Sequence, residues 1–277
     1  MWTLSGFADE IDDDLEVQCQ VLDELGIRYL ELRSAWGVNV LDLTDAQLDE
    51  VERVLAAHGI AVSSIGSPIG KINIEDDFEA HLMRMERALD VAERLRAPFI
   101  RIFSFFLRPD QAPGAHRDEV LRRMRALTDR AEARSSGVVL LHENEKEIFG
   151  DTPERVLDIV TSVDSPALRL AWDPANYVQV GVRPYTEGYE ALRAHTVYIQ
   201  VKDALLVSGD VVPAGEGDGQ VPETVRALCE EGFDGFFSME PHLGDTTSFG
   251  AISGRDGFVR ATEALLKIFA EQGIEYR

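Results

Sequence analysis

The sequence predicts a single (β/α)8 barrel over residues 1–277, and two observations lead to this prediction. Short runs rich in β-branched residues alternate with helical patterns, which is typical of βα units around a parallel sheet. The chain has 277 residues, 45% of them hydrophobic, and barrels of this class commonly fold as one unit of about 250 residues. We expect eight strands, near residues 3–8, 28–33, 60–66, 98–104, 138–143, 168–173, 196–202 and 234–240.

Helix signals fill the segments between these strands. Apolar side chains recur at spacings of three and four within residues 78–92, which places one apolar stripe against the barrel. Thr44 and Gln47 form a capping-box pattern, and Thr152 before Pro153 is typical of an N-cap followed by proline in the first turn. A left-handed residue is favoured between a helix end and the next strand. Four glycines stand at such places: Gly26, Gly59, Gly137 and Gly232.

Composition and charge restrict the class of protein. The 50 acidic and 27 basic residues give a net charge of −23, which repels phosphate backbones and argues against a nucleic-acid partner. The first residues show neither a basic start nor a long apolar run, so we expect no signal peptide and no membrane span. Cys19 and Cys229 fall on predicted helices, where we expect buried free thiols and, with them, a cytoplasmic location.

Four of the predicted strands end in a side chain that can bind a metal ion. The runs VVLLHE, LRLAWD, VYIQ and FFSME end at Glu143, Asp173, Gln200 and Glu240. At the carboxyl end of a parallel barrel, such residues converge on one mouth. Successive side chains of a strand alternate in direction, so the residue two positions before each donor shares its face. These residues are of types suited to the barrel interior. All four donors can therefore face inward.

These four oxygen donors predict a cation site at the barrel mouth. For any one of the carboxylates, the alternative is a side chain that faces solvent or caps the next helix. Their occurrence at four matching strand ends favours the metal site. Three carboxylates and one amide oxygen form a hard donor set, so we expect one divalent cation, Mn²⁺ or Mg²⁺.

Glu143 and Glu240 are also the candidate catalytic residues. They end the fifth and eighth strands, across the mouth, so a substrate held between them meets a carboxylate on each face. One carboxylate would remove a proton alpha to a carbonyl, and the other would return it. A divalent cation that holds the carbonyl and a neighbouring hydroxyl lowers the energy of the enediolate. This chemistry indicates an isomerase or epimerase of a sugar or related hydroxycarbonyl compound.

Lys202 and His242 are candidates for substrate binding or proton transfer. Lys202 shares the inward phase of Gln200 and could bind a hydroxyl, a carboxylate or a phosphate. Its alternative role is an ion pair with a ligand carboxylate or with Asp203. His242 follows Glu240 by two residues and could relay a proton, or could lie behind the site or at the surface.

Three further residues are weaker candidates for substrate binding. Lys71, in the run SPIGK after the third strand, could reach the mouth. Asn176 stands close to the strand-end Asp173. Glu216 lies in a glycine-rich loop and could bind a substrate hydroxyl, although a plain loop carboxylate is the alternative.

Several short motifs resemble those of one superfamily over nearly the whole chain. They are HEN at 142–144, WDPAN at 172–176, IQVKD at 199–203, GEGDG at 215–219 and MEPH at 239–242. With the opening run FADEIDDDLEVQCQVLDELGIRYLELR, they resemble the sugar phosphate isomerase/epimerase superfamily, which has a xylose-isomerase-like barrel. The resemblance implies that Glu143 and Glu240 both bind the metal and exchange the proton.

The chain departs from the commonest pattern of this superfamily at two positions. Many members have histidine where this chain has Gln200, and in this respect it is similar to hydroxypyruvate isomerases, which use glutamine as the ligand. The usual histidine a few residues after the strand-six aspartate is absent, and Asn176 stands nearby. This difference separates the chain from close relatives of ketose 3-epimerases.

The resemblance leaves alternative functions open. A lyase of the inosose-dehydratase type would use the same metal site, with Lys202 or His242 protonating the departing hydroxyl. An apurinic-site endonuclease would need a histidine-rich cluster, and none of the six histidines ends one of the four strands. A non-catalytic sugar-binding domain would not need both glutamates. The expected partners are a small sugar-like substrate and, since many related barrels associate, further copies of the chain.

Overall fold

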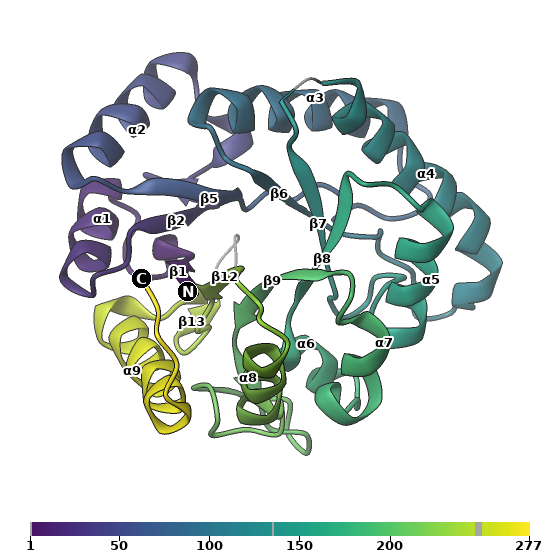
Figure 1. The fold of residues 1–277 in the computed structure, drawn as a ribbon. Coiled ribbons are helices and arrows are strands. Elements are labelled where there is room, and N and C mark those ends of the chain that lie inside the picture. Colours follow the sequence, from purple (N-terminus) through teal and green to yellow (C-terminus); the bar gives the residue numbers. More distant parts are fainter. Residues whose placement is uncertain (1, 135, 247–250) are drawn as a thin grey trace.

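The structure is a computed structural model that describes residues 2–134, 136–246 and 251–277. Its central strands are β1 (Thr3–Gly6), β2 (Tyr29–Leu32), β5 (Ala61–Ile65), β6 (Phe99–Ile102), β7 (Val139–Glu143), β8 (Leu168–Trp172), β9 (Thr196–Val201) and β12 (Phe236–Met239). They form one sheet in the order β1-β12-β9-β8-β7-β6-β5-β2. All its pairings are parallel, and the sheet curls into a nearly closed barrel (Figure 1).

Helices surround the barrel as an outer ring (Figure 1). They are α1 (Leu15–Glu24), α2 (Asp45–His58), α3 (Phe78–Leu95), α4 (Pro113–Ala133), α5 (Pro153–Val163), α6 (Pro174–Gln179), α7 (Glu190–Leu192), α8 (Val221–Glu230) and α9 (Gly254–Gln272). Three short turns of helix add to them: η1 (Ala8–Glu10), η2 (Val40–Asp42) and the π-helical η3 (Tyr185–Tyr189). No helix among the described residues is long and apolar enough to cross a membrane.

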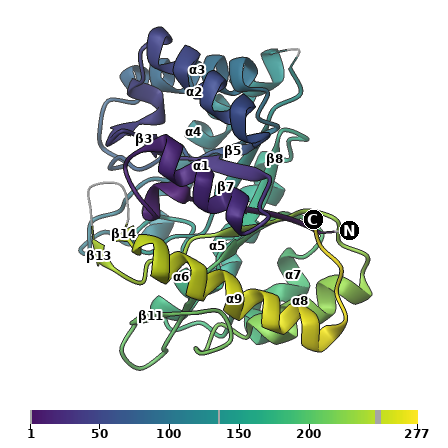
Figure 2. The same ribbon diagram turned by 90° about the vertical axis from the view of Figure 1, so that its left-hand side faces the viewer.

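The two ends of the chain lie side by side and help to close the ring. Figures 1 and 2 both show the N- and C-termini together. The Leu4 amide donates to the Arg277 carbonyl at 2.9 Å, and the Arg277 amide donates to the Trp2 carbonyl at 2.8 Å. Since β1 pairs with β12, the last strand and the chain terminus hold the first strand from both sides.

The predicted elements are confirmed, with one correction outside the barrel. Each of the eight strands lies within its predicted range. Thr44 and Gln47 form the complete capping box, whereas Thr152 precedes Pro153 without a side-chain hydrogen bond to the helix. Cys19 is buried, but Cys229 is exposed, so its predicted burial was wrong. The four helix-end glycines all have positive φ: Gly26, Gly59, Gly137 and Gly232.

Inward-facing side chains fill the lower part of the barrel. Leu141, Ala171 and Tyr198 form a cluster separate from the main core, and Phe99 and Phe236 pack against it. The Tyr198 ring lies 5.8 Å from the Phe99 ring and 5.5 Å from the Phe236 ring, measured between centroids. Four of these residues belong to strands that end in predicted donors, so the inward phase predicted for those strands is confirmed.

The loops after β5, β6 and β7 are joined above the barrel. Phe106 forms isolated bridges to Asn73 on one side and to Ile148 on the other. Gly70 allows the first loop to approach the second: its φ is +91°, and a Cβ atom there would overlap the Phe103 carbonyl. The tight backbone of the run SPIGK is therefore a packing requirement of this face.

We expect Gly70→Ala to destabilise the fold by about 3 kcal/mol, because the substitution adds a backbone overlap to an unfavourable φ. Urea unfolding monitored by circular dichroism would measure the loss. The matched control is Gly114→Ala in α4, where φ is not positive and no atom lies within 4 Å of the added Cβ. The control should be neutral or stabilising by about 0.5–1 kcal/mol. Equal midpoints for the two variants would contradict the prediction.

Candidate active site

Three of the four predicted donors meet at the barrel mouth. Glu143 ends β7, Asp173 follows β8 directly, and Glu240 follows β12 directly. Each offers a carboxylate oxygen, and the three oxygens lie within 4.8 Å of one another. All three side chains are buried. The structure therefore brings three buried carboxylates into a group of the size that one metal ion would occupy.

Polar contacts from the HEN and WDPAN motifs fix two of these carboxylates. Asn144 accepts from the Asp173 amide at 3.0 Å and donates to the Asp173 carbonyl at 2.8 Å. Asp173 caps α6, because its side chain accepts from the Asn176 amide at 2.9 Å. The Asn176 side chain donates to Glu143 at 3.2 Å. Asn176 thus holds Glu143 and Asp173 in place, a structural role beside the substrate-binding role predicted for it.

The fourth predicted donor, Gln200, lies deeper in the barrel than Glu240. In the pairing of β9 with β12, Gln200 is opposite Ser238, two residues before Glu240. Its Nε2 donates to Glu31 Oε2 at 3.1 Å. Its Oε1 is buried and has no hydrogen-bond partner among the described residues, so one acceptor of this amide remains free.

Cationic side chains contact the carboxylate group from several sides. Lys202 Nζ lies 2.8 Å from Asp173 Oδ2 and 2.9 Å from Glu240 Oε2, which confirms the ion-pair alternative considered for this lysine. Arg101 Nη1 lies 3.3 Å from Glu143 and 3.5 Å from Glu240. Arg33 donates to Glu240 Oε1 at 3.2 Å. The buried negative charge is therefore paired, as burial requires.

Aromatic rings contact these cations. The guanidinium groups of Arg33 and Arg101 lie 4.6 and 4.7 Å from the centroid of the Phe7 ring. The Phe103 ring lies 4.9 Å from the Arg101 guanidinium group, and Lys71 Nζ lies 4.3 Å from the same ring. These cation–π contacts favour the observed positions of both arginines.

The pKa values of these groups are shifted in different directions. Burial raises the pKa of Glu143 to about 8, although Arg101 opposes the shift. Burial also raises the pKa of Asp173 to about 6, against the attraction of Lys202. Burial also acts to raise the pKa of Glu240, but the neighbouring positive charges, Lys202 first, together outweigh it and hold this pKa well below the usual value. For Lys202, burial acts to lower the pKa, but the surrounding carboxylates, led by Asp173 and Glu240, together overcome it and raise this pKa well above the usual value.

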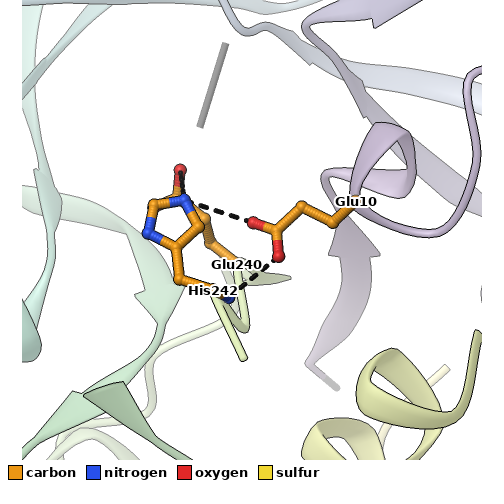
Figure 3. Close-up of side chains that lie close together, drawn as sticks. All are labelled: Glu10, Glu240 and His242. Carbon is orange, nitrogen blue, oxygen red and sulfur yellow. Dashed lines mark hydrogen bonds and ion pairs between the residues drawn. The ribbon is translucent and has the colours of Figure 1, made fainter. Parts of the chain in front are cut away.

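Glu10 and His242 form a second group beside Glu240 (Figure 3). Glu10 ends η1, and its Oε2 accepts from the His242 amide at 2.8 Å and from the Ser253 hydroxyl at 2.7 Å. The His242 ring nitrogen Nε2 lies 3.3 Å from Glu10 Oε1 and 3.5 Å from Glu240 Oε1. Burial raises the pKa of Glu10 to about 8. Glu10 therefore holds the segment that places His242 against Glu240.

The remaining two candidates lie at the edge of the site or outside it. Lys71 is half-buried and pairs with Glu145 at 3.2 Å. Glu216 is exposed and accepts from Arg260 at 2.9 Å, so its placement gives no support to a role in substrate binding.

The GEGDG motif that contains Glu216 has a structural explanation. The buried carboxylate of Asp203 accepts hydrogen bonds from the amides of Gly215, Gly217 and Gly219, at 2.9, 3.2 and 2.8 Å. A Cβ atom at either of the last two glycines would overlap Asp203. The motif therefore folds this loop around Asp203.

The donor chemistry of this site fits a hard divalent cation. Glu143, Asp173 and Glu240 supply carboxylate oxygens, and Gln200 has an unused buried amide oxygen. Oxygen-only donor sets are typical of Mg²⁺ and Mn²⁺ sites. Because Lys202 already contacts Asp173 and Glu240, such an ion would share these oxygens with a protein ammonium group.

Sequence reasoning missed four charged residues of the site. Glu31 and Arg33 share the inward phase of β2, and Arg101 shares the inward phase of β6 with Phe99. Because side chains alternate in direction along a strand, these three residues could have been predicted from the sequence to point into the barrel. Glu10 lies in a short 3-10 turn with no such periodicity, so the pattern offered no comparable signal.

Comparisons with known proteins give one family and many similar folds. The sequence model for xylose isomerase-like TIM barrels matches residues 19–274. A search of curated proteins found no match. A xylose isomerase-like TIM barrel protein from Mycobacterium smegmatis, in complex with magnesium, is 20% identical with a TM-score of 0.70, over 97% of this chain and 98% of that chain.

Two further solved structures match over similar lengths. The probable 3-DHS dehydratase AsbF from Bacillus anthracis is 19% identical with a TM-score of 0.75, over 96% of this chain and 98% of that chain. The IOLI protein with a bound zinc atom is 16% identical with a TM-score of 0.77, over 97% of this chain and 98% of that chain. At these identities the matches establish the shared fold, while the bound metals and the dehydratase activity are properties of those proteins.

Proposed function

The chain belongs to the xylose isomerase-like TIM barrel family, and we propose that it is a divalent-metal-dependent isomerase or epimerase of a sugar or related hydroxycarbonyl compound. The observation that carries this proposal is the group of three buried carboxylates, Glu143, Asp173 and Glu240, at the barrel mouth. In a barrel of this kind, the carboxyl ends of the strands are where active sites are built.

The placement of Glu143 and Glu240 supports a role in proton transfer at a carbon centre. They come from β7 and β12, which are separated in the sheet by β8 and β9, so a substrate bound at the mouth would meet carboxylates from two different parts of the barrel. One would accept the proton alpha to the carbonyl, and the other would donate a proton to the product. Arg101 contacts both glutamates and Arg33 contacts Glu240, so both carboxylates are held in fixed orientations.

The same carboxylates, with Asp173 and Gln200, would hold the cation. When bound, a divalent cation supplies Lewis-acid polarisation of the substrate carbonyl and a template for its neighbouring hydroxyl. Asn144 and Asn176 keep Asp173 and Glu143 at their positions through direct hydrogen bonds. Arg101, which pairs with Glu143, is itself buried and lies against the rings of Phe7 and Phe103.

A lyase of the dehydratase type is the second candidate, and the position of Lys202 favours it. Its ammonium group is buried, remains protonated and lies 2.9 Å from Glu240. A proton donor beside a proton-abstracting carboxylate is what the loss of a β-hydroxyl requires. An endonuclease role has less support, because the two groups of potential metal ligands among the described residues contain a single histidine, His242.

We expect the purified protein to catalyse exchange of one carbon-bound substrate proton for deuterium when Mn²⁺ or Mg²⁺ is added. The test is an NMR screen in D2O over aldoses, ketoses, inososes and hydroxypyruvate. Exchange with formation of an isomer or epimer supports the first candidate, whereas exchange with loss of water supports the lyase. If Glu240→Gln exchanges as fast as the wild type, the activity comes from elsewhere. Absence of exchange with every compound would overturn proton transfer on this substrate class.

A further inference from the structure

The buried glutamate beneath the carboxylate group, Glu31, has no role in the proton transfer described above. It lies on β2 and is completely buried. One of its oxygens, Oε2, accepts two hydrogen bonds: from the Ser238 hydroxyl at 2.7 Å and from Gln200 Nε2 at 3.1 Å. The other oxygen, Oε1, has no hydrogen-bond partner among the described residues. Burial of a carboxylate is unfavourable unless hydrogen bonds or opposite charges compensate it, so an oxygen without a partner at this position calls for an explanation.

The contact with Glu31 decides which end of the Gln200 amide is free. A primary amide has a donor end, NH2, and an acceptor end, C=O, and only the acceptor end can bind a cation. In the structure, Glu31 Oε2 accepts from both the Ser238 hydroxyl and the Gln200 NH2 group, so the donor end of the amide faces Glu31. The Gln200 oxygen is thereby left without a protein partner.

Neighbours that fix the orientation of a metal ligand commonly control its affinity for the ion. For a histidine ligand, the outer partner usually accepts the second ring N–H. Glu31 has the same relation to Gln200 that such a partner has to a histidine ligand. It accepts a hydrogen bond from the Gln200 NH2 group, while the oxygen of the same amide stays free.

We propose that Glu31 is a positioning residue that orients the Gln200 amide so that its oxygen is presented to the divalent cation. The proposal rests on the proposed function, because it requires that a cation binds the carboxylate group. Glu31 lies on β2, far in the sequence from the four predicted donors, and the proposal adds it to the residues that determine metal binding.

The test measures Mn²⁺ affinity of the purified protein by electron paramagnetic resonance, without any substrate. Glu31→Gln preserves the size of the side chain, and we expect it to weaken Mn²⁺ binding by about tenfold to a hundredfold. Gln200→Ala should also weaken binding. In the Gln200→Ala background, Glu31→Gln should change the affinity by less than about twofold, because the group it orients is absent.

The comparison of Glu31→Gln in the wild-type and Gln200→Ala backgrounds separates an effect on the orientation of Gln200 from an effect of the Glu31 charge. If Glu31→Gln weakens binding equally in both backgrounds, Glu31 acts through its charge, and the proposal is wrong. The charge-matched control is Glu145→Gln, which removes a half-buried carboxylate that is paired with Lys71 and, among the hydrogen bonds of the described residues, has none with Gln200. It should affect the Mn²⁺ affinity less than Glu31→Gln does, and a larger effect would also overturn the proposal.

A second measurement uses the wild-type protein and does not depend on how the variants fold. In protein labelled with ¹⁵N-glutamine, the side-chain NH2 signals of Gln200 are those absent from Gln200→Ala. They should shift when Mg²⁺ is added, and unshifted signals at saturating Mg²⁺ would overturn the proposal. A wild-type protein that binds neither ion would instead overturn the metal-dependent function itself, so the two failures are distinguishable.

Discussion

Replacing Glu143 or Glu240 with glutamine is expected to lower proton transfer by at least about a hundredfold while the barrel stays folded. The amide keeps the shape of the side chain and can still occupy its hydrogen-bonding position, but it cannot accept the substrate proton. Both residues lie outside the apolar cluster of the barrel interior, so the substitutions leave the packing of that cluster intact. The measurement is the rate of deuterium exchange on the substrate found in the screen, with circular dichroism as the check of folding.

The matched control for these two variants is Glu50→Gln. Glu50 is an exposed residue of α2 whose carboxylate pairs with Arg53 at 2.7 Å, outside the barrel. This variant should exchange at the wild-type rate. Near-normal turnover in both Glu143→Gln and Glu240→Gln would show that the mechanism with two carboxylates is wrong. A large loss in only one of them would leave a single essential base and favour the lyase.

The barrel could be predicted from the sequence because its signals are local. Each strand is a short apolar run that stands between a glycine turn and a helix pattern, and the phase within a strand follows from alternation alone. For this reason, both the inward direction of Glu143 and the position of Asp173 at the end of β8 could be predicted from the sequence. The same reasoning extends to the charged residues inside β2 and β6.

The height of each residue in the barrel could not be predicted in the same way. Counting by twos gives the direction of a side chain, but its depth depends on the register between neighbouring strands. The pairing of β8 with β9 shifts between Leu170 and Ala171, and that of β2 with β5 shifts between Leu30 and Glu31. Such irregularities have no signature in a single sequence. Gln200 therefore lies beside Glu31, and Lys202 lies where it contacts Asp173 and Glu240.

Contacts between distant parts of the chain could not be predicted from the sequence either. Glu10 and His242 are separated by most of the chain, and they meet because β12 pairs with β1 as the barrel closes. The contact of Phe7 with Arg101 joins the end of β1 to β6, two segments that lie about 95 residues apart in the sequence and that only the barrel brings together. A sequence shows these residues without showing that they are neighbours.

Removal of divalent metal with a chelator is expected to abolish proton transfer, and Mn²⁺ or Mg²⁺ is expected to restore it. The solved relatives hold magnesium in one case and zinc in another, so the fold does not determine the ion. We expect the donor set to determine it, because the three carboxylates and the proposed amide oxygen suit hard cations, while zinc more often recruits histidine or cysteine. Gln200→His should therefore keep metal binding but shift the preference toward Zn²⁺ or Co²⁺. Elemental analysis of protein purified without added metal, followed by reconstitution of the chelated form, measures both effects.

Two results would contradict this assignment in different ways. Stoichiometric zinc that cannot be replaced by Mn²⁺ with activity would mean that geometry outweighs donor type at this site. Full activity in the chelated protein would mean that no divalent ion is needed, and the buried ammonium of Lys202, which contacts Asp173 and Glu240, would then be the candidate to supply positive charge beside Glu240. Lys202→Met separates these cases, because the neutral side chain removes the repulsion between the ammonium group and a divalent cation. In a metal-dependent enzyme the variant should bind Mn²⁺ more tightly than the wild type, whereas in a metal-independent enzyme it should lose its activity.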